Sequence, residues 1–169
     1  MMNPIVSIIM GSTSDLPVME KAAAFFEEME IPFEMNALSA HRTPEKVEAF
    51  SKGALDRGIK VIIAGAGMAA HLPGVIAAST PIPVIGVPIK GSSLEGMDAL
   101  LAIVQMPPGI PVATVAVNGA LNAAILAGQI LASGDKEMAQ KMIHYKENLK
   151  QKIVKANEQL SQLEYKFKV

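Results

Sequence analysis

The residues best suited to chemistry lie in three short polar segments, each of which follows an apolar run. The first segment, residues 11–15, reads Gly-Ser-Thr-Ser-Asp. Hydroxyls and free N–H groups at the start of a helix bind anions. One serine is enough to cap a helix, so hydroxyls on Ser12, Thr13 and Ser14 favour an anion-binding loop over a plain cap. Asp15 would repel a phosphate at close range, but it could accept hydrogen bonds from ribose hydroxyls.

The second segment, residues 39–44, reads Ser-Ala-His-Arg-Thr-Pro. His41 is of the residue type that titrates near neutral pH, so it is suited to moving a proton. Arg42 offers a fork of N–H donors that matches a phosphate. A lone histidine in a loop is usually an exposed residue without a task, but the arginine beside it favours a functional interpretation.

The third segment, residues 65–74, reads Gly-Ala-Gly-Met-Ala-Ala-His-Leu-Pro-Gly. Its small residues let a ligand approach the backbone, whose N–H groups could hold a carboxylate or CO2. The pattern is not a dinucleotide fingerprint, because Met-Ala-Ala follows the Gly-x-Gly. His71 has two interpretations, a packing residue at a helix start or a residue of the site. A fourth segment, residues 88–93, follows the fourth strand, and the proline-rich residues 105–111 suit either an active-site rim or an intersubunit wall. Asn118 could also face the site or a neighbouring subunit.

The composition narrows the chemistry further. The chain has no cysteine, no Gly-x-Ser-x-Gly elbow and no metal-ligand spacing, so we expect proton transfer and anion binding with no metal or cofactor. A formal net charge of -1 argues against nucleic acid and anionic membranes as partners. No uninterrupted apolar stretch is long enough to span a bilayer. We therefore expect a soluble, cytoplasmic protein.

Short apolar runs alternate with helical patterns over most of the chain. The expected strands are residues 5–10, 33–38, 60–64, 84–87 and 112–117, and the expected helices are 16–30, 44–57, 71–79, 93–104 and 119–132. Strands that are apolar on both faces predict a parallel sheet covered on both sides. The fold class is α/β, a flavodoxin-like doubly wound five-stranded sheet in the order 2-1-3-4-5. Ligands bind at the switch point of such a sheet, between strands 1 and 3, which brings the polar segments together.

The last segment, residues 135–168, has no proline or glycine, and its apolar residues recur every three or four positions. This spacing predicts one long helix of roughly 50 Å. Such a helix either frays at its end or packs on a neighbouring subunit, and we favour the second because the stripe is longer than a small domain. We predict one α/β domain over residues 1–169, with residues 135–169 as an intersubunit helix.

These motifs resemble those of the class I N5-carboxyaminoimidazole ribonucleotide mutases. The likeness rests on the three polar segments and on residues 92–124, and it covers roughly residues 5–155. The pairing of Ser-Ala-His-Arg-Thr-Pro with Ala-Ala-His-Leu-Pro-Gly is highly specific. Met68 departs from the pattern because many relatives have glycine there, and a side chain at this position either narrows the loop or points away. The segment 118–121 is shorter than in some relatives.

The resemblance implies a cofactor-independent isomerase of purine (IMP) biosynthesis, a homo-octamer that acts on a small ribonucleotide. The isomerase would interconvert N5-carboxyaminoimidazole ribonucleotide and 4-carboxy-5-aminoimidazole ribonucleotide by releasing and recapturing CO2. The implied roles are acid and base for His41, phosphate binding for Ser12 and Arg42, and ribose binding for Asp15. The loop that would hold the base and the carboxyl group comprises Ala66, Gly67, Ala69, Ala70, His71 and Leu72. The residues that would complete the pocket are Ser14, Ser39 and Ala40.

Three other functions stay open at this stage. The first is a carboxylase on the same fold that adds free CO2 to aminoimidazole ribonucleotide. The second is a non-catalytic module that binds a nucleotide or a flavin phosphate. The third is a structural assembly protein, suggested by the long last helix, although it leaves three polar loops at one sheet edge unexplained.

Overall fold

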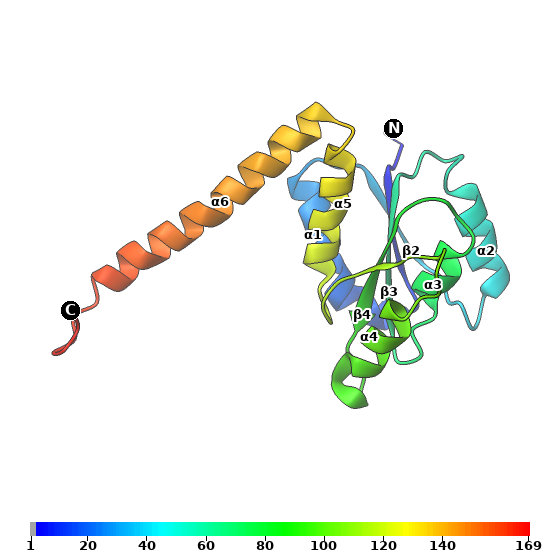
Figure 1. Ribbon diagram of the computed structural model, residues 1–169, viewed down its shortest axis with the longest axis horizontal. Coiled ribbons are helices and arrows are strands. Elements are labelled where there is room, and N and C mark those ends of the chain that lie inside the picture. Colours follow the sequence, from blue (N-terminus) through cyan, green and yellow to red (C-terminus); the bar gives the residue numbers. More distant parts are fainter. Residues whose placement is uncertain (1–2) are drawn as a thin grey trace.

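The computed structural model describes residues 3–169 and shows a five-stranded parallel sheet flanked by helices (Figure 1). The strands are β1 (Val6–Met10), β2 (Phe33–Ala37), β3 (Val61–Gly67), β4 (Val84–Ile89) and β5 (Ala113–Thr114). Their order is β2-β1-β3-β4-β5, and every neighbouring pair is parallel. This confirms the predicted class and strand order. Residues 1 and 2, which the predicted domain includes, lie outside the described residues.

Two layers of helices cover the sheet, one on each face. Helices α1 (Leu16–Glu28) and α5 (Ala120–Ala132) pack on one face, where Phe25 and Phe26 are buried against Val6, Ile8 and Val61. Helices α2 (Pro44–Gly53), α3 (Leu72–Ala77) and α4 (Met97–Val104) cover the other face. The strands β1, β3 and β4 are buried on both faces, as the continuous apolar runs predict.

The strand β5 is much shorter than predicted. It has two residues instead of the six expected over 112–117. The chain pairs with β4 through the N–H of Val115, which donates to Gly86 O (3.1 Å), but Ala116 O then accepts from Gly119 N (2.8 Å) in a turn. That turn takes Ala116 out of the ladder, so the apolar sequence does not continue as a strand.

The strand β3 is longer than predicted, because it runs to Gly67 and not to residue 64. The register pairs Gly65, Ala66 and Gly67 with Val87, Pro88 and Ile89 of β4. The first three residues of the predicted glycine-rich loop are therefore the end of a strand. β4 likewise ends at Ile89, two residues beyond the prediction.

The last helix, α6 (Lys136–Ser161), begins at Asp135, whose Oδ1 accepts hydrogen bonds from the N–H groups of Glu137 (2.9 Å) and Met138 (3.0 Å). At 1.5 Å per residue its 26 residues span about 39 Å, shorter than predicted. It ends at Ser161, where the Lys168 ammonium donates to carbonyls of the last turn, including those of Leu160 and Ser161. Figure 1 shows α6 leaving the body of the fold and ending far from it.

Candidate active site

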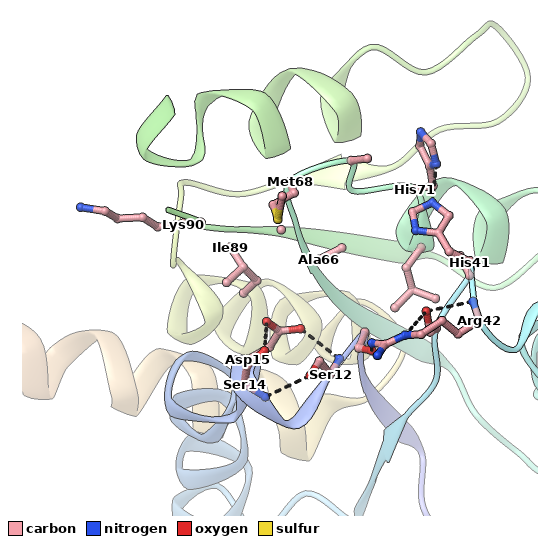
Figure 2. A pocket seen from close by; sticks show the side chains of 17 residues that line it. Ser12, Ser14, Asp15, His41, Arg42, Ala66, Met68, His71, Ile89 and Lys90 are labelled. Atoms are coloured by element: carbon pink, nitrogen blue, oxygen red, sulfur yellow. Dashed lines mark hydrogen bonds between the residues drawn. The ribbon is translucent and has the colours of Figure 1, made fainter. Parts of the chain in front are cut away.

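A cavity of about 370 Å³ opens at the carboxyl ends of β1, β2, β3 and β4, beside the switch point of the sheet (Figure 2). Its size is within the range of small-molecule sites. The predicted site residues that line it are Ser12, Ser14, Asp15, Ser39, Ala40, His41, Arg42, Ala66, Gly67, Ala69, His71 and Leu72. One predicted residue, Ala70, is outside the lining, since it is 2% exposed and packs in the core under α2 and α3.

The loop after β1 is held by its own hydrogen bonds. Ser12 Oγ accepts from Ser14 N (3.3 Å), and Ser12 N donates to Asp15 Oδ2 (3.2 Å), which together form a capping box around a 3-10 turn at Thr13–Asp15. The Ser14 hydroxyl lies 3.4 Å from Asp15 Oδ1. Partial burial raises the pKa of the Asp15 carboxyl above its ordinary value, and the hydrogen bonds from Ser12 and Ser14 oppose that rise. Ser12 therefore caps the turn and also lines the cavity.

The loop after β2 carries Arg42 across to the loop after β1. Ser39 Oγ accepts from the Arg42 backbone N–H (3.2 Å) and lies 3.4 Å from its Nε, while Arg42 Nη2 donates to Gly11 O (3.3 Å). Within residues 3–169 these side-chain bonds use two of the five guanidinium donors, so three remain for an anion. Thr43 is the N-cap residue of α2, but its hydroxyl does not cap the helix; it bonds the N–H and C=O of Ser39 at 3.1 Å each and closes the loop instead.

Two histidines meet at the mouth of the cavity. His41 Nε2 lies 2.7 Å from His71 Nδ1, and the rings are nearly perpendicular at 84° with centroids 4.9 Å apart. A hydrogen bond of this length requires a proton on one of the two nitrogens and a lone pair on the other. Figure 2 shows the pair beside Arg42, with both rings at one end of the cavity. The pair can therefore exchange a proton, and both of its side chains line the cavity.

The ends of β3 and β4 and the start of α3 give the cavity an apolar, closely packed wall. Ala66, Leu72 and Ile89 line it and are at most 7% exposed. A Cβ on Gly67 would lie 3.1 Å from the carbonyl oxygen of Ile89, so a side chain there would have no room. In the loop, Ala70 N donates to Met68 O (2.9 Å) and His71 N donates to Ala69 O (2.8 Å). These two backbone donors are already used, and they cannot also hold a carboxylate in this conformation.

Five lining residues were not among the predicted site residues: Gly11, Met68, Ile89, Lys90 and Gly91. Ile89 and its neighbours lie within the segment 88–93, whose position after the fourth strand was the available signal. Lys90 turns its side chain away from the cavity and pairs with Glu95 (Figure 2). Asn118 holds this segment from behind, because its Oδ1 accepts from Lys90 N (2.9 Å) and its N–H donates to Pro88 O (2.8 Å).

The fold and the cavity define a doubly wound α/β protein with a cavity of small-molecule size at the switch point of its sheet and a histidine pair at the mouth. A sequence model of the family described as AIR carboxylase matches residues 5–152, and the chain belongs to this family. The N5-carboxyaminoimidazole ribonucleotide mutase of Pyrococcus abyssi is 60% identical over 147 residues, 87% of this chain and 84% of that protein. The mutase of Thermotoga maritima is 55% identical over 163 residues, 96% and 95% of the two chains. The crystal structure of Treponema denticola PurE has a TM-score of 0.84 and 35% identity, and the match covers 94% of this chain and 99% of that one.

Among residues 3–169, no helix combines the length and the apolar character needed to cross a membrane. Helix α6 is long enough, but charged residues recur along it.

Proposed function

We propose that this chain is an N5-carboxyaminoimidazole ribonucleotide mutase of purine biosynthesis. The observation that carries the proposal is the His41–His71 pair at 2.7 Å, placed at the mouth of a cavity that has both a polar and an apolar lining. The reaction moves a carboxyl group from nitrogen to carbon within one molecule. It needs a phosphate site, a group that gives and takes one proton, and a wall that retains CO2.

The polar end of the cavity supplies the recognition. The free guanidinium donors of Arg42 and the hydroxyls of Ser12 and Ser14 suit the phosphate of a ribonucleotide. The Asp15 carboxylate suits the ribose hydroxyls, and its hydrogen bonds to the loop fix its orientation before a ligand arrives. Phosphate binding at this end would place the aminoimidazole toward the glycine-rich wall, with Ser39 and Ala40 closing the side.

The histidine pair supplies the chemistry. Protonated His41 gives a proton to N5 of the substrate, the N5–carboxyl bond breaks, and CO2 is released. The enamine-type carbon C4 attacks that CO2 and forms the new C–C bond, and neutral His41 then removes the C4 proton. The proton gained by N5 equals the proton lost from C4, so the sum is an isomerisation without a cofactor. His71 Nδ1 forms the hydrogen bond with His41 Nε2, as donor or acceptor, and so orients the His41 ring.

A second candidate is a carboxylase that takes free CO2 and aminoimidazole ribonucleotide. The observation in its favour is the description of the matched family, which names a carboxylase and not a mutase. The same cavity would serve both reactions, because recapture of CO2 is the second half of the mutase reaction. The two activities differ in which substrate is consumed when bicarbonate is absent.

The test is turnover of N5-carboxyaminoimidazole ribonucleotide by wild type, His41→Asn and His71→Phe, without ATP, metal or added bicarbonate. Loss of general acid–base catalysis should lower kcat about 10²–10⁴-fold in His41→Asn, with substrate binding retained. In His71→Phe, which keeps a ring but loses the hydrogen bond, we expect a smaller loss of kcat and a changed pH profile.

The matched control is His144→Asn, an exposed histidine on α6 that is outside the cavity, and we expect wild-type turnover. Wild type that is inactive alone but active with aminoimidazole ribonucleotide and bicarbonate would favour the carboxylase. Ligand binding without turnover of either substrate would leave a non-catalytic binding module.

We also propose a homo-octamer in the cytoplasm in which α6 packs on neighbouring subunits. The support is the row of exposed apolar residues along α6, among them Ile153 at 65% and Leu160 at 57%. Contiguous apolar surface of this kind marks an interaction site. A phosphorylated substrate is retained inside cells, which supports the cytoplasm as the place of the reaction.

A further inference from the structure

Met68 is the one large apolar side chain of the cavity lining, among the described residues, that is mostly exposed. Its exposed fraction is 59%, whereas Leu72 and Ile89 on the same wall are at most 6% exposed. Its φ of 53° lies in the left-handed region, which residues with a side chain seldom adopt. Figure 2 shows Met68 on the rim across the cavity from Ser14 and Asp15.

The side chain of Met68 rests on the next loop of the sheet edge. A Cβ built on Gly91 would lie 3.2 Å from Met68 Cγ, so the methionine lies against the face of Gly91 that carries no side chain. Gly91 follows β4, whereas Met68 follows β3, and both line the cavity. Met68 therefore bridges two loops over the apolar end of the site.

The cavity is chemically divided, and Met68 belongs to its apolar part. Ser12, Asp15 and Arg42 form the polar end, while Ala66 and Ile89 form the other end together with Met68. CO2 has no net charge or dipole, so retaining it depends on shape and on excluding water more than on charge. Methionine is flexible and adapts to irregular gaps, which suits a side chain that must admit the substrate and then cover it.

We propose that Met68 is a cap that closes over the carboxyl end of the cavity and keeps released CO2 beside the aminoimidazole. This rests on the proposed mutase function and adds a positioning residue to it. The cap determines what fraction of the released CO2 is recaptured and what fraction escapes. CO2 that is retained becomes 4-carboxy-5-aminoimidazole ribonucleotide, and CO2 that escapes leaves aminoimidazole ribonucleotide behind.

The experiment measures the ratio of aminoimidazole ribonucleotide to 4-carboxy product formed from N5-carboxyaminoimidazole ribonucleotide, with the uncatalysed decay subtracted. Met68→Gly removes the cap and takes the positive φ freely, so its fold should hold. Met68→Ala also removes the cap but keeps the unfavourable φ. Met68→Leu keeps a side chain of similar volume. We expect the ratio to rise several-fold in the Gly and Ala variants and to stay near the wild-type value in the Leu variant.

A fourth variant displaces the Met68 side chain while leaving the methionine itself in place. In Gly91→Ala the added methyl crowds Met68 Cγ, so the side chain must shift by a few tenths of an ångström. We expect a smaller rise in the ratio, and no further rise when Gly91→Ala is added to Met68→Gly, because the group that it displaces is then absent.

An unchanged ratio in all variants would overturn the cap while leaving the mutase function intact. A rise in Met68→Gly that is missing in Met68→Ala would also overturn it, since the backbone and not the side chain would then control the partition. A wild type that fails to consume the substrate would instead refute the proposed function.

Discussion

The loops around the cavity and the far half of α6 differ in how completely the chain's own contacts hold them. Around the cavity, Ser12 caps its turn, Ser39 and Gly11 bind Arg42, and His41 meets His71. On α6, only the first turns pack, and the side chains from Leu149 onward face outward. Contacts within one chain therefore hold the loops around the cavity, whereas the far half of α6 has an apolar stripe that its own fold leaves uncovered.

The largest expected effect comes from placing charge on that stripe. In Ile153→Glu/Leu160→Glu, each carboxylate would have to be desolvated at the interface, so we expect the assembly to dissociate toward subunits of 17.9 kDa. The control is Gln151→Glu/Gln159→Glu, which adds the same charge at exposed polar positions of α6 and should leave the assembly intact. Light scattering measures both masses. An unchanged mass for the first pair would break the comparison, because the stripe would then need no partner.

Two substitutions to alanine can locate the boundary between the packed and unpacked parts of α6. Met142 is 5% exposed, and its Sδ would lie 2.9 Å from a Cβ on Gly128 of α5. Met142→Ala should therefore lower the free energy of unfolding by about 2–4 kcal/mol, whereas Ile153→Ala should change it by less than about 0.5 kcal/mol. Urea unfolding in a Leu160→Glu background excludes the contribution of subunit contacts. Equal losses at the two positions would mean that the stripe is covered within one chain.

Much of the fold could be predicted because buried parallel strands have a simple sequence pattern, a short run that is apolar on both faces. β1, β3 and β4 are apolar on both faces, so their sequences alone predict a covered parallel sheet and its switch point. The length of β5 could not be predicted, since residues 112–117 are mostly apolar and only the turn from Ala116 to Gly119 ends its pairing. The end of α6 was not predicted either, since the apolar periodicity continues past Ser161, where the chain instead folds back and Lys168 contacts the last turn.

The candidate site shows the same division. The residue types predict which loops carry chemistry, because Ser, Asp, His and Arg gather after the first two strands. They do not predict that His71 pairs with His41, since the partners are 30 positions apart and meet only once β2 and β3 lie on either side of β1. The sequence also does not predict that Ala70 lies outside the cavity lining, because its burial depends on the tight turns at Met68 and Ala69 that direct its methyl into the core.

The smallest expected effect concerns Asp15, and it tests whether the site is organised at a cost in stability. Burial raises the pKa of the Asp15 carboxyl in the folded protein above its ordinary value of 3.8. Below the pKa of the unfolded chain, Asp15 is protonated in both states and costs nothing. As the pH rises, the unfolded chain loses this proton first, so the free energy of unfolding falls until the pH passes the higher folded pKa. At neutral pH the ionised carboxylate therefore destabilises the fold.

Asp15→Asn removes that titration and keeps an oxygen that can accept from Ser12 N. We expect the variant to be more stable than wild type at pH 7 by well under about 1 kcal/mol, because the carboxylate is partly exposed and screened by water. The advantage should vanish as the pH falls below 3.8, and turnover should fall because the charged ribose acceptor is lost. Urea unfolding at both pH values measures the difference in free energy of unfolding between the variant and wild type. The titration of all other groups cancels in this difference.

A variant less stable than wild type at pH 7 would show that the hydrogen bonds of the capping box outweigh burial. Asp15 would then stabilise its loop, and the contrast with the uncovered stripe of α6 would be sharper still.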